Sequence, residues 1–294
     1  MQPQSTQPFT ISALLRLTRF WNLVIIGIAQ YCTAGFLIDS KLILDIHLLL
    51  LSVSTILIAA AGYVINDYYD IKIDLINKPE RVVIGKSITR RYAILFHTSL
   101  SLSGVAIGFL LNWKIGVVNF LSAFFLWLYS NNLKRQPFIG NFLVAVLTGL
   151  SILIVTLLYN ASPSFSPFSP LSHSYIIIYS LFAFFMTLVR EMIKDMEDLR
   201  GDNTFGCKTI PIIWGLRKAK YLVYSVLILF ATSVFYINYI YVGLPMYYFV
   251  CFLFIPLGWL LALLIRADTI KDFYTLSQLC KVIMLLGISS MAFI

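Results

Sequence analysis

Long apolar runs alternate with short polar segments along almost the whole chain. Each run is about 20 residues long, the length that an α-helix needs to cross the hydrocarbon core of a bilayer. The pattern therefore predicts an all-α, polytopic membrane bundle of about nine transmembrane helices. The predicted spans are 20–38, 44–65, 92–111, 115–133, 138–158, 174–190, 221–240, 245–265 and 276–294.

The composition supports the membrane assignment. Of the 294 residues, 60% are hydrophobic and only 12% are charged, which lies far outside the range of soluble domains. The polar N-terminus has neither the basic region nor the cleavage site of a signal peptide. We therefore expect one membrane domain over 1–294, with a polar tail at 1–10. The four cysteines are scattered and form neither a zinc spacing nor a disulfide framework.

The basic residues account for the net charge of +9 without a nucleic-acid partner. Lys and Arg gather in 66–91, directly after 133, and in 190–220, whereas the intervening loops contain only Lys41 and Lys114. An excess of Lys and Arg marks cytoplasmic loops. The pattern predicts a cytoplasmic N-terminus and, with nine spans, an external C-terminus; in a prokaryote the membrane would be the plasma membrane.

Eight of the thirteen acidic residues lie in two short segments, 66–74 and 191–202. In both, three aspartates are spaced by three and then four residues, which places them on one face of a helix. Glu191 extends the second row by a turn, whereas we expect Glu197, off that row, to be a surface residue. The aspartates are Asp67, Asp70 and Asp74 in the first segment and Asp195, Asp198 and Asp202 in the second.

The two acidic segments are expected to meet at one face of the membrane. They follow spans two and six, which run in the same direction, and each begins a long, charged cytoplasmic loop, 66–91 or 191–220. Carboxylates at the negative ends of two helices need a cation or a set of basic partners. Two Mg²⁺ ions could lie between the segments and bridge them to a diphosphate. In a membrane, that diphosphate would carry an apolar tail.

Basic residues near the acids are candidates for binding phosphate oxygens. Each also has a simpler explanation, since cytoplasmic loops are basic without any ligand. Arg19 and Asn22, at the start of the first span, could bind a substrate head group, or Arg19 could extend to the interface. The loop candidates are Arg81, Lys134, Arg135, Lys194 and Lys208.

Aromatic residues close to the acidic segments could stabilise an allylic cation through their ring faces. Aromatic residues are also common at any membrane interface, so each assignment stays open. Asp268 and Asp272 have no matching acidic segment, and we expect them to be solvated. The aromatic candidates are Tyr63, Tyr68, Tyr69, Trp127 and Tyr129.

The paired acidic segments resemble the UbiA superfamily of intramembrane prenyltransferases. The first matches the motif N-D-x-x-D-x-x-x-D from Asn66 to Asp74, the second aspartate-rich motif follows span six, and an early Arg-x-x-Asn is present at Arg19 and Asn22. The resemblance implies a central cavity, open to the cytoplasmic side, in which two Mg²⁺ ions hold a prenyl diphosphate. The metal ligands that it implies are Asn66, Asp67, Asp70, Asp74, Asp195, Asp198 and Asp202, with Asp67, Asp70, Asp195 and Asp198 as the catalytic set.

The acceptor of the prenyl group is less sharply defined. The segment from Arg190 to Asp202, followed by Lys208, is most similar to members that prenylate the hydroxyl of a glycerol-phosphate ether. That resemblance implies a geranylgeranyl group as the one transferred. The family's usual Arg-Pro is Arg81-Val82 here, which leaves an aromatic acceptor of a quinone or pigment pathway as the alternative. Membrane lipids surround the protein, and no obligate protein partner is implied.

A cation transporter is the alternative from another class, because intramembrane carboxylates also mark ion pathways. It predicts helices interrupted near the middle of the bilayer, with the acids deep in the membrane. Here the acids lie at the cytoplasmic ends of unbroken apolar runs, among basic residues that would repel a moving cation. The sequence therefore favours the prenyltransferase.

Overall fold

The computed structural model describes residues 10–160, 170–242 and 244–294. Within these ranges nine helical segments are long and apolar enough to cross a membrane, which confirms the predicted number. The helices are α1 (Ile11–Leu17), α2 (Phe20–Leu37), α3 (Ile46–Asn77), α4 (Arg90–Leu111), α5 (Trp113–Asn131), α6 (Ile139–Asn160), α7 (Pro170–Glu197), α8 (Leu199–Thr204), α9 (Ile210–Ile237), α10 (Met246–Phe249), α11 (Ile255–Arg266) and α12 (Ile270–Ser290).

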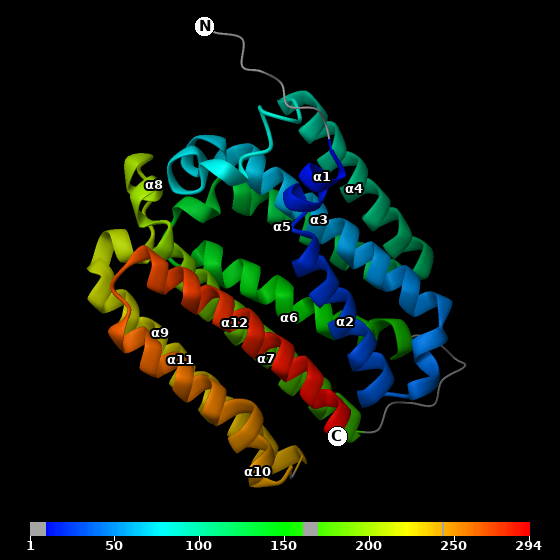
Figure 1. The fold of residues 1–294 in the computed structure, drawn as a ribbon. Helices are drawn as coiled ribbons and strands as arrows, with labels where there is room; N and C mark the ends of the chain where they lie inside the picture. Colours follow the sequence, from blue (N-terminus) through cyan, green and yellow to red (C-terminus); the bar gives the residue numbers. More distant parts are fainter. Residues whose placement is uncertain (1–9, 161–169, 243) are drawn as a thin grey trace, which may run out of the picture.

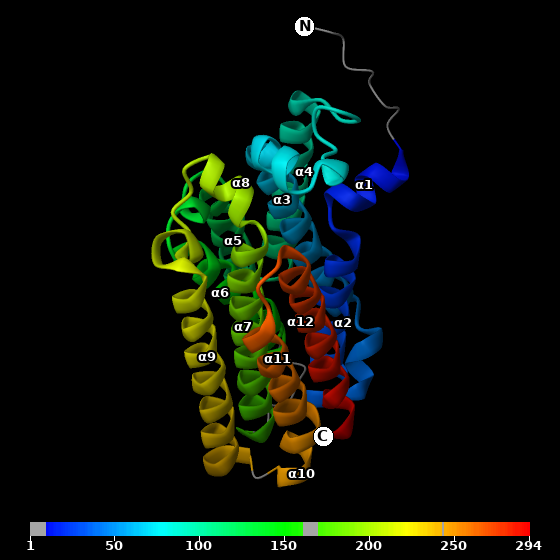
Figure 2. The same cartoon turned by 60° about the vertical axis from the view of Figure 1, so that its left-hand side comes forward.

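The long helices lie side by side and form one bundle (Figures 1 and 2). Helix α3 packs against α2, α4 and α5, and α7 packs against α6, α9 and α12. The largest buried cluster lies around α7, where Phe185 stacks on Phe230 with ring centroids 5.3 Å apart. The short helices α1 and α8 lie at one end of the bundle, and α10 and the C-terminus lie at the other (Figure 2).

Helix α3 continues well beyond the predicted span 44–65 and carries the first acidic motif in its last turns. Its N-terminus is capped by Asp45, whose side chain accepts a hydrogen bond from the His47 N–H at 2.9 Å. It ends at Asn77, where Lys78 precedes Pro79 and is therefore disfavoured in the helical conformation. The first acidic motif thus continues its helix, as its spacing predicts, and the loop begins after Asn77 instead of at residue 66.

The spacing of the second motif predicts one continuous helix, but the structure shows a break within it. Helix α7 ends at Glu197, and Asp198 adopts φ −92° and ψ 8° before the short helix α8 turns away. Asp195 therefore belongs to α7, Asp198 to the break and Asp202 to α8. The break brings α8 against the end of α3.

Candidate functional site

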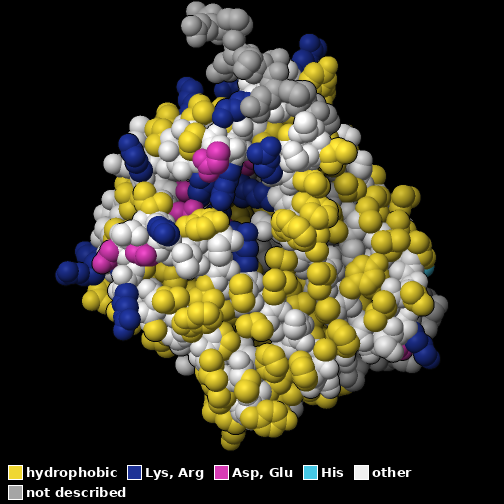
Figure 3. All heavy atoms as spheres, in the orientation of Figure 1, with side chains coloured by type: hydrophobic (Ala, Val, Ile, Leu, Met, Phe, Trp, Pro, Cys, Tyr) yellow, Lys and Arg dark blue, Asp and Glu magenta, His cyan; other side chains and the backbone are white. Residues whose placement is uncertain are grey.

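A cavity of about 720 Å³ lies between α2, α3, α5, α6, α7 and α12. Its polar end lies beneath the end of the bundle that carries α8, where basic and acidic side chains gather around a hollow in a mostly hydrophobic face (Figure 3). Eight Lys and Arg and eight Asp and Glu side chains line it, so most of the acids have a basic neighbour. The acids are Asp67, Asp70, Asp74, Glu191, Asp195, Glu197, Asp198 and Asp202.

The first motif is held by two basic residues from other elements. Arg19 lies in the break between α1 and α2, and its Nη2 donates to Asp67 Oδ1 at 2.9 Å and to Asn66 Oδ1 at 3.2 Å. Lys134, in the turn between α5 and α6, forms an ion pair with the buried Asp70. These contacts anchor the last turns of α3 to two neighbouring segments.

Arg19 reaches the motif through an unusual backbone conformation and an aromatic contact. Its φ of 52° lies in the left-handed region, which residues other than glycine rarely adopt. The guanidinium carbon lies 4.8 Å from the centroid of the Tyr63 ring, and Asn22 Nδ2 donates to the Tyr63 hydroxyl at 3.2 Å. The predicted pair Arg19 and Asn22 thus contacts the same residue of α3, Tyr63.

The second motif is held mainly by Lys78, the residue that follows α3. Lys78 Nζ lies 2.9 Å from Glu197 Oε1 and 2.7 Å from Asp198 Oδ1. Glu197 is buried at 5% exposure, so its prediction as a surface residue was wrong. Asp195 is held separately, by Asn141 Nδ2 at 2.7 Å. Lys78, which follows the helix that carries the first motif, therefore neutralises acids of the second.

Glu191 lies deeper in the cavity and accepts two charged hydrogen bonds. Arg190 Nη1 donates to Glu191 Oε1 and Lys194 Nζ donates to Glu191 Oε2, both at 2.8 Å. With both oxygens occupied, Glu191 serves as the counterion of these two bases. Asp74, Asp195 and Asp202 differ, because within the described residues no Lys or Arg lies within ion-pair distance of them.

Residues 29–276 match the UbiA prenyltransferase family. The chain belongs to that family. It is an integral, multi-pass membrane protein and a prenyltransferase, in agreement with the resemblance of its two acidic motifs.

Two relatives of this UbiA prenyltransferase carry the same name. It is 34% identical to the digeranylgeranylglyceryl phosphate synthase of Saccharolobus solfataricus, over 89% of both chains. It is 32% identical to the synthase of the same name from Sulfurisphaera tokodaii, over 88% of this chain and 89% of that one.

Solved structures share the fold. One described as digeranylgeranylglyceryl phosphate synthase aligns with a TM-score of 0.69 at 26% identity, over 96% of this chain and 97% of that one. A UbiA homologue from Archaeoglobus fulgidus, bound to DMAPP and Mg²⁺, aligns with a TM-score of 0.60 at 16% identity, over 96% of this chain and 99% of that one.

The donor set of this prenyltransferase suits hard cations. Carboxylate and amide oxygens, together with substrate phosphates, are the ligands that Mg²⁺ takes in proteins. All seven residues predicted as metal ligands line the same cavity. Among the described residues, no three His, Cys, Asp or Glu side chains converge on one point, because Arg19, Lys78 and Lys134 hold three of the carboxylates. Metal ligation by these residues stays a prediction.

Charges at the polar end shift the pKa values of groups outside the membrane-spanning segments. Burial lowers the pKa of Lys78, but Asp198 and Glu197 outweigh that effect and leave it above the ordinary value. Burial raises the pKa of Asp202 to about 6; Lys134 opposes this rise, and Asp198 adds to it. A cation bound beside such a buried carboxyl would stabilise its ionised form and lower its pKa.

Two predicted phosphate-binding residues lie outside the cavity. Arg135 and Lys208 are exposed and do not line it. The Lys208 N–H instead donates to the Arg135 carbonyl oxygen at 2.9 Å, which joins the turn after α5 to the segment after α8. The other five predicted substrate-binding residues do line the cavity: Arg19, Asn22, Arg81, Lys134 and Lys194.

The aromatic candidates and the two acids expected to be solvated can also be placed relative to the cavity. Of the aromatic candidates, Tyr63 and Tyr129 line the cavity, whereas the other three do not. Asp268 is solvated, with its side chain 83% exposed, although it pairs with Lys220 at 3.0 Å. Asp272 caps the N-terminus of α12. Both lie outside the cavity, as expected.

Several cavity residues were not predicted as site residues. Lys78 lies four residues after Asp74, a spacing that places it near the aspartate row, yet it was counted only as a loop cation. Lys281 lies within the predicted span 276–294 and is its one charged residue, which is itself a signal. Sequence patterns give no comparable signal for Asn77 and Asn141, which act through contacts with α8 and Asp195.

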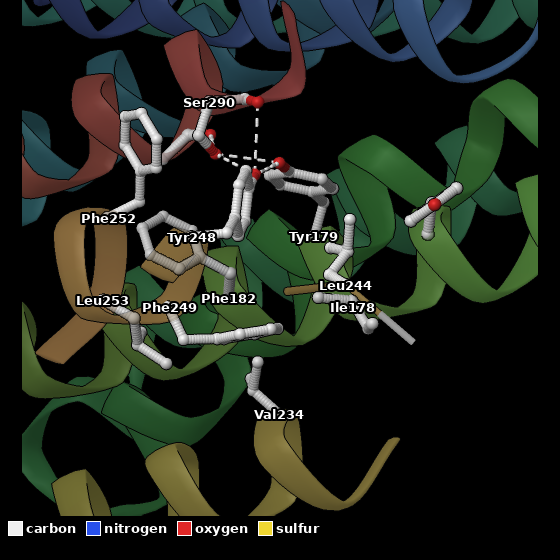
Figure 4. Close-up of a pocket in the computed structure, with 12 residues that line it drawn as sticks. Ile178, Tyr179, Phe182, Val234, Leu244, Tyr248, Phe249, Phe252, Leu253 and Ser290 are labelled. Carbon is white, nitrogen blue, oxygen red and sulfur yellow. Dashed lines mark hydrogen bonds between the residues drawn. The ribbon is translucent and has the colours of Figure 1, made fainter. Parts of the chain in front are cut away.

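A second, much smaller cavity of about 40 Å³ lies at the opposite end of the bundle (Figure 4). Four residues with hydroxyls line it: Tyr175, Tyr179, Tyr248 and Ser290. The hydroxyls of Tyr179 and Tyr248 lie 2.8 Å and 2.7 Å from Ser290 Oγ, and these contacts join α7, α10 and α12 beside a mostly apolar lining. These three hydroxyls satisfy one another, so the cluster has a structural explanation.

Proposed function

We propose that this prenyltransferase moves a prenyl group, most simply geranylgeranyl, from its diphosphate to the free hydroxyl of a glycerol-phosphate prenyl ether, with Mg²⁺. The observation that carries the proposal is the single cavity that both acidic motifs line. The synthases named above, at 32–34% identity over almost the whole chain, support the glycerol-phosphate acceptor.

The polar end of the cavity suits the diphosphate. We propose that two Mg²⁺ ions lie between Asn66, Asp67, Asp70 and Asp74 on one side and Asp195, Asp198 and Asp202 on the other. These ions would supply the charge that stabilises the leaving diphosphate. Arg19, Lys134 and Lys194, which line the same region, are placed to donate to phosphate oxygens.

The deeper walls of the cavity suit the prenyl tails. Apolar side chains from α2, α3, α5 and α6 line this part, among them Ile26, Ile58, Leu126, Leu147 and Ile154. A prenyl chain that enters from the bilayer exchanges lipid tails for these side chains, so the walls accommodate it by van der Waals packing. An amphiphilic donor therefore has a polar site and an apolar site in one cavity.

The reaction breaks the bond between C1 of the prenyl group and the diphosphate oxygen, whose electron pair leaves with the diphosphate. The acceptor hydroxyl oxygen forms the new bond to C1, and its proton passes to the released diphosphate or a neighbouring carboxylate. The Tyr63 and Tyr129 side chains line the cavity close to the motifs and are placed to stabilise the positive charge that develops on C1.

The topology belongs to the same proposal. The end of the bundle with both motifs also carries the Lys- and Arg-rich segments, which supports a cytoplasmic site and a cytoplasmic N-terminus, in the plasma membrane if the source is prokaryotic. Helices α3 and α7 run from one side of the bundle into the motifs, unlike the interrupted helices of a transporter.

A transfer assay tests the function directly. Purified protein would be incubated with labelled geranylgeranyl diphosphate, Mg²⁺, and either a glycerol-phosphate geranylgeranyl ether or a hydroxylated aromatic acceptor. The expected result is transfer to the ether lipid. Transfer to the aromatic acceptor alone would replace the proposed acceptor, and no transfer to any acceptor would contradict the proposal.

A further inference from the structure

A row of polar side chains on α12 faces the cavity within a membrane-spanning helix. Ser277, Gln278 and Lys281 all line the cavity, at spacings that place them on one helix face. Lys281 lies about 17 Å along the helix axis from Ile270. Ionisable side chains at such positions are costly and usually functional, and the two acidic motifs do not account for this one.

The charges that act most strongly on Lys281 are positive. They belong to Arg190, Lys194, Arg19 and Arg81. Among the described residues no carboxylate lies within ion-pair distance of Lys281, whereas Arg19 and Lys194 each have one. This side of the cavity therefore holds more positive charge than its own acids neutralise. An anion would stabilise it.

Arg190 has a hydrogen-bond donor available for that anion. Its Nη1 donates to Glu191, but its Nε is buried and has no partner. A buried donor without a partner costs about 1–3 kcal/mol. Arg81 lies at the mouth on the same side, with its guanidinium carbon 5.9 Å from the centroid of the Tyr274 ring on α12.

We propose that Lys281 and Arg190 bind the phosphate group of the acceptor, at a subsite distinct from that of the donor diphosphate. This inference rests on the proposed function. The diphosphate needs the acidic motifs and their cations, whereas Lys281 pairs with no carboxylate among the described residues and its strongest charged neighbours are basic. An ammonium group beside an arginine matches a phosphate monoester. The subsite would select phosphate-bearing acceptors, since a neutral aromatic acceptor would leave Lys281 without a counterion.

The test compares Lys281→Met with the wild type in phospholipid-free detergent, using the ether lipid with and without its phosphate. For the phosphate-bearing acceptor, KM should rise about 10- to 100-fold in the variant. The KM for geranylgeranyl diphosphate and the Mg²⁺ requirement should not change. The preference for the phosphate-bearing over the phosphate-free acceptor should largely disappear, and Lys281→Arg should retain it.

The matched control is Lys271→Met, an exposed position on the same helix, which should leave both KM values unchanged. Thermal unfolding of each variant separates loss of fold from loss of binding. An unchanged acceptor KM, a retained preference for phosphate, or a raised donor KM would overturn the subsite.

Failure of the proposed function would look different. The wild type would then transfer to neither ether lipid. Direct binding of the phosphate-bearing ether lipid without donor, compared between the wild type and Lys281→Met, would still decide the subsite: equal affinities would overturn it, and weaker binding by the variant would support it.

Discussion

Asn77 Oδ1 accepts a hydrogen bond from the Gly201 N–H at 2.8 Å. The same side chain donates through Nδ2 to the Asp198 carbonyl oxygen at 2.9 Å. Asn77 is the last residue of α3, and Gly201 lies in α8, so one amide joins the ends of the two acidic motifs. A Cβ atom on residue 201 would lie 2.5 Å from Asn77 Nδ2, which explains why glycine suits this position.

Gly201→Ala should therefore separate the motifs. We expect a loss of about 1–3 kcal/mol in stability from the enforced contact, together with a fall in the transfer rate. Thermal unfolding and the transfer assay measure the two effects. Gly258→Ala on α11 is the control, because its Cβ would meet nothing within 4 Å. Equal stability and activity of the two variants would show that the contact with Asn77 is unimportant.

Lys78→Met should destabilise the protein, because it leaves the buried Glu197 without its cation. A loss of about 1–3 kcal/mol is expected for an uncompensated partner, measured by thermal unfolding in detergent. Lys78→Arg should recover part of the loss. Lys72→Met, at an exposed lysine near the end of α3, should have little effect. A Lys78→Met protein as stable as the wild type would contradict the role of this ion pair.

Asp67→Ala and Asp198→Ala should each reduce turnover by about 10²–10³-fold, the scale on which loss of one group that stabilises developing charge acts. The transfer assay at saturating Mg²⁺ measures the change. Asp268→Ala is the control, since its side chain is 83% exposed and lies outside the cavity. Wild-type rates in either of the first two variants would remove that aspartate from the proposed metal site.

Removal of divalent cations should abolish transfer, and Mg²⁺ should restore it. Mn²⁺ binding, followed by electron paramagnetic resonance in the presence of a non-reactive prenyl diphosphate analogue, should give two ions per chain, since both motifs supply ligands. One bound ion would reduce the proposed site to a single metal. Full activity in a chelator would exclude Mg²⁺ from the reaction.

The membrane spans could be predicted because length and hydropathy alone determine which segments cross a bilayer. Hydropathy alone does not give the position where α3 ends. Polar side chains end a hydropathic span at residue 65, but they do not end the backbone hydrogen bonding of the helix, which continues to Asn77, just before Lys78 and Pro79. The cavity supplies the polar surroundings that these last turns require.

The acidic residues of the site could be predicted from their repeated spacing, whereas their partners could not. Lys78, Arg135 and Lys208 are all basic residues in predicted cytoplasmic segments. The spacing of Lys78 from Asp74 places it near the aspartate row, but only the packing of α8 against α3 shows that it pairs with Asp198, whereas the other two lie outside the cavity. Contacts between distant segments depend on tertiary structure, and a single sequence holds no pattern for them.

The equal numbers of acidic and basic side chains around the cavity have a consequence for how substrates enter. A lining that is electroneutral as a whole neither attracts nor repels a charged lipid strongly from a distance. A prenyl diphosphate accompanied by its cations would bring little net charge, so loading would require no large charge transfer into the bilayer. Lys78 and Lys134 would then exchange carboxylate partners for phosphate oxygens, and the interior would stay balanced both before and after loading.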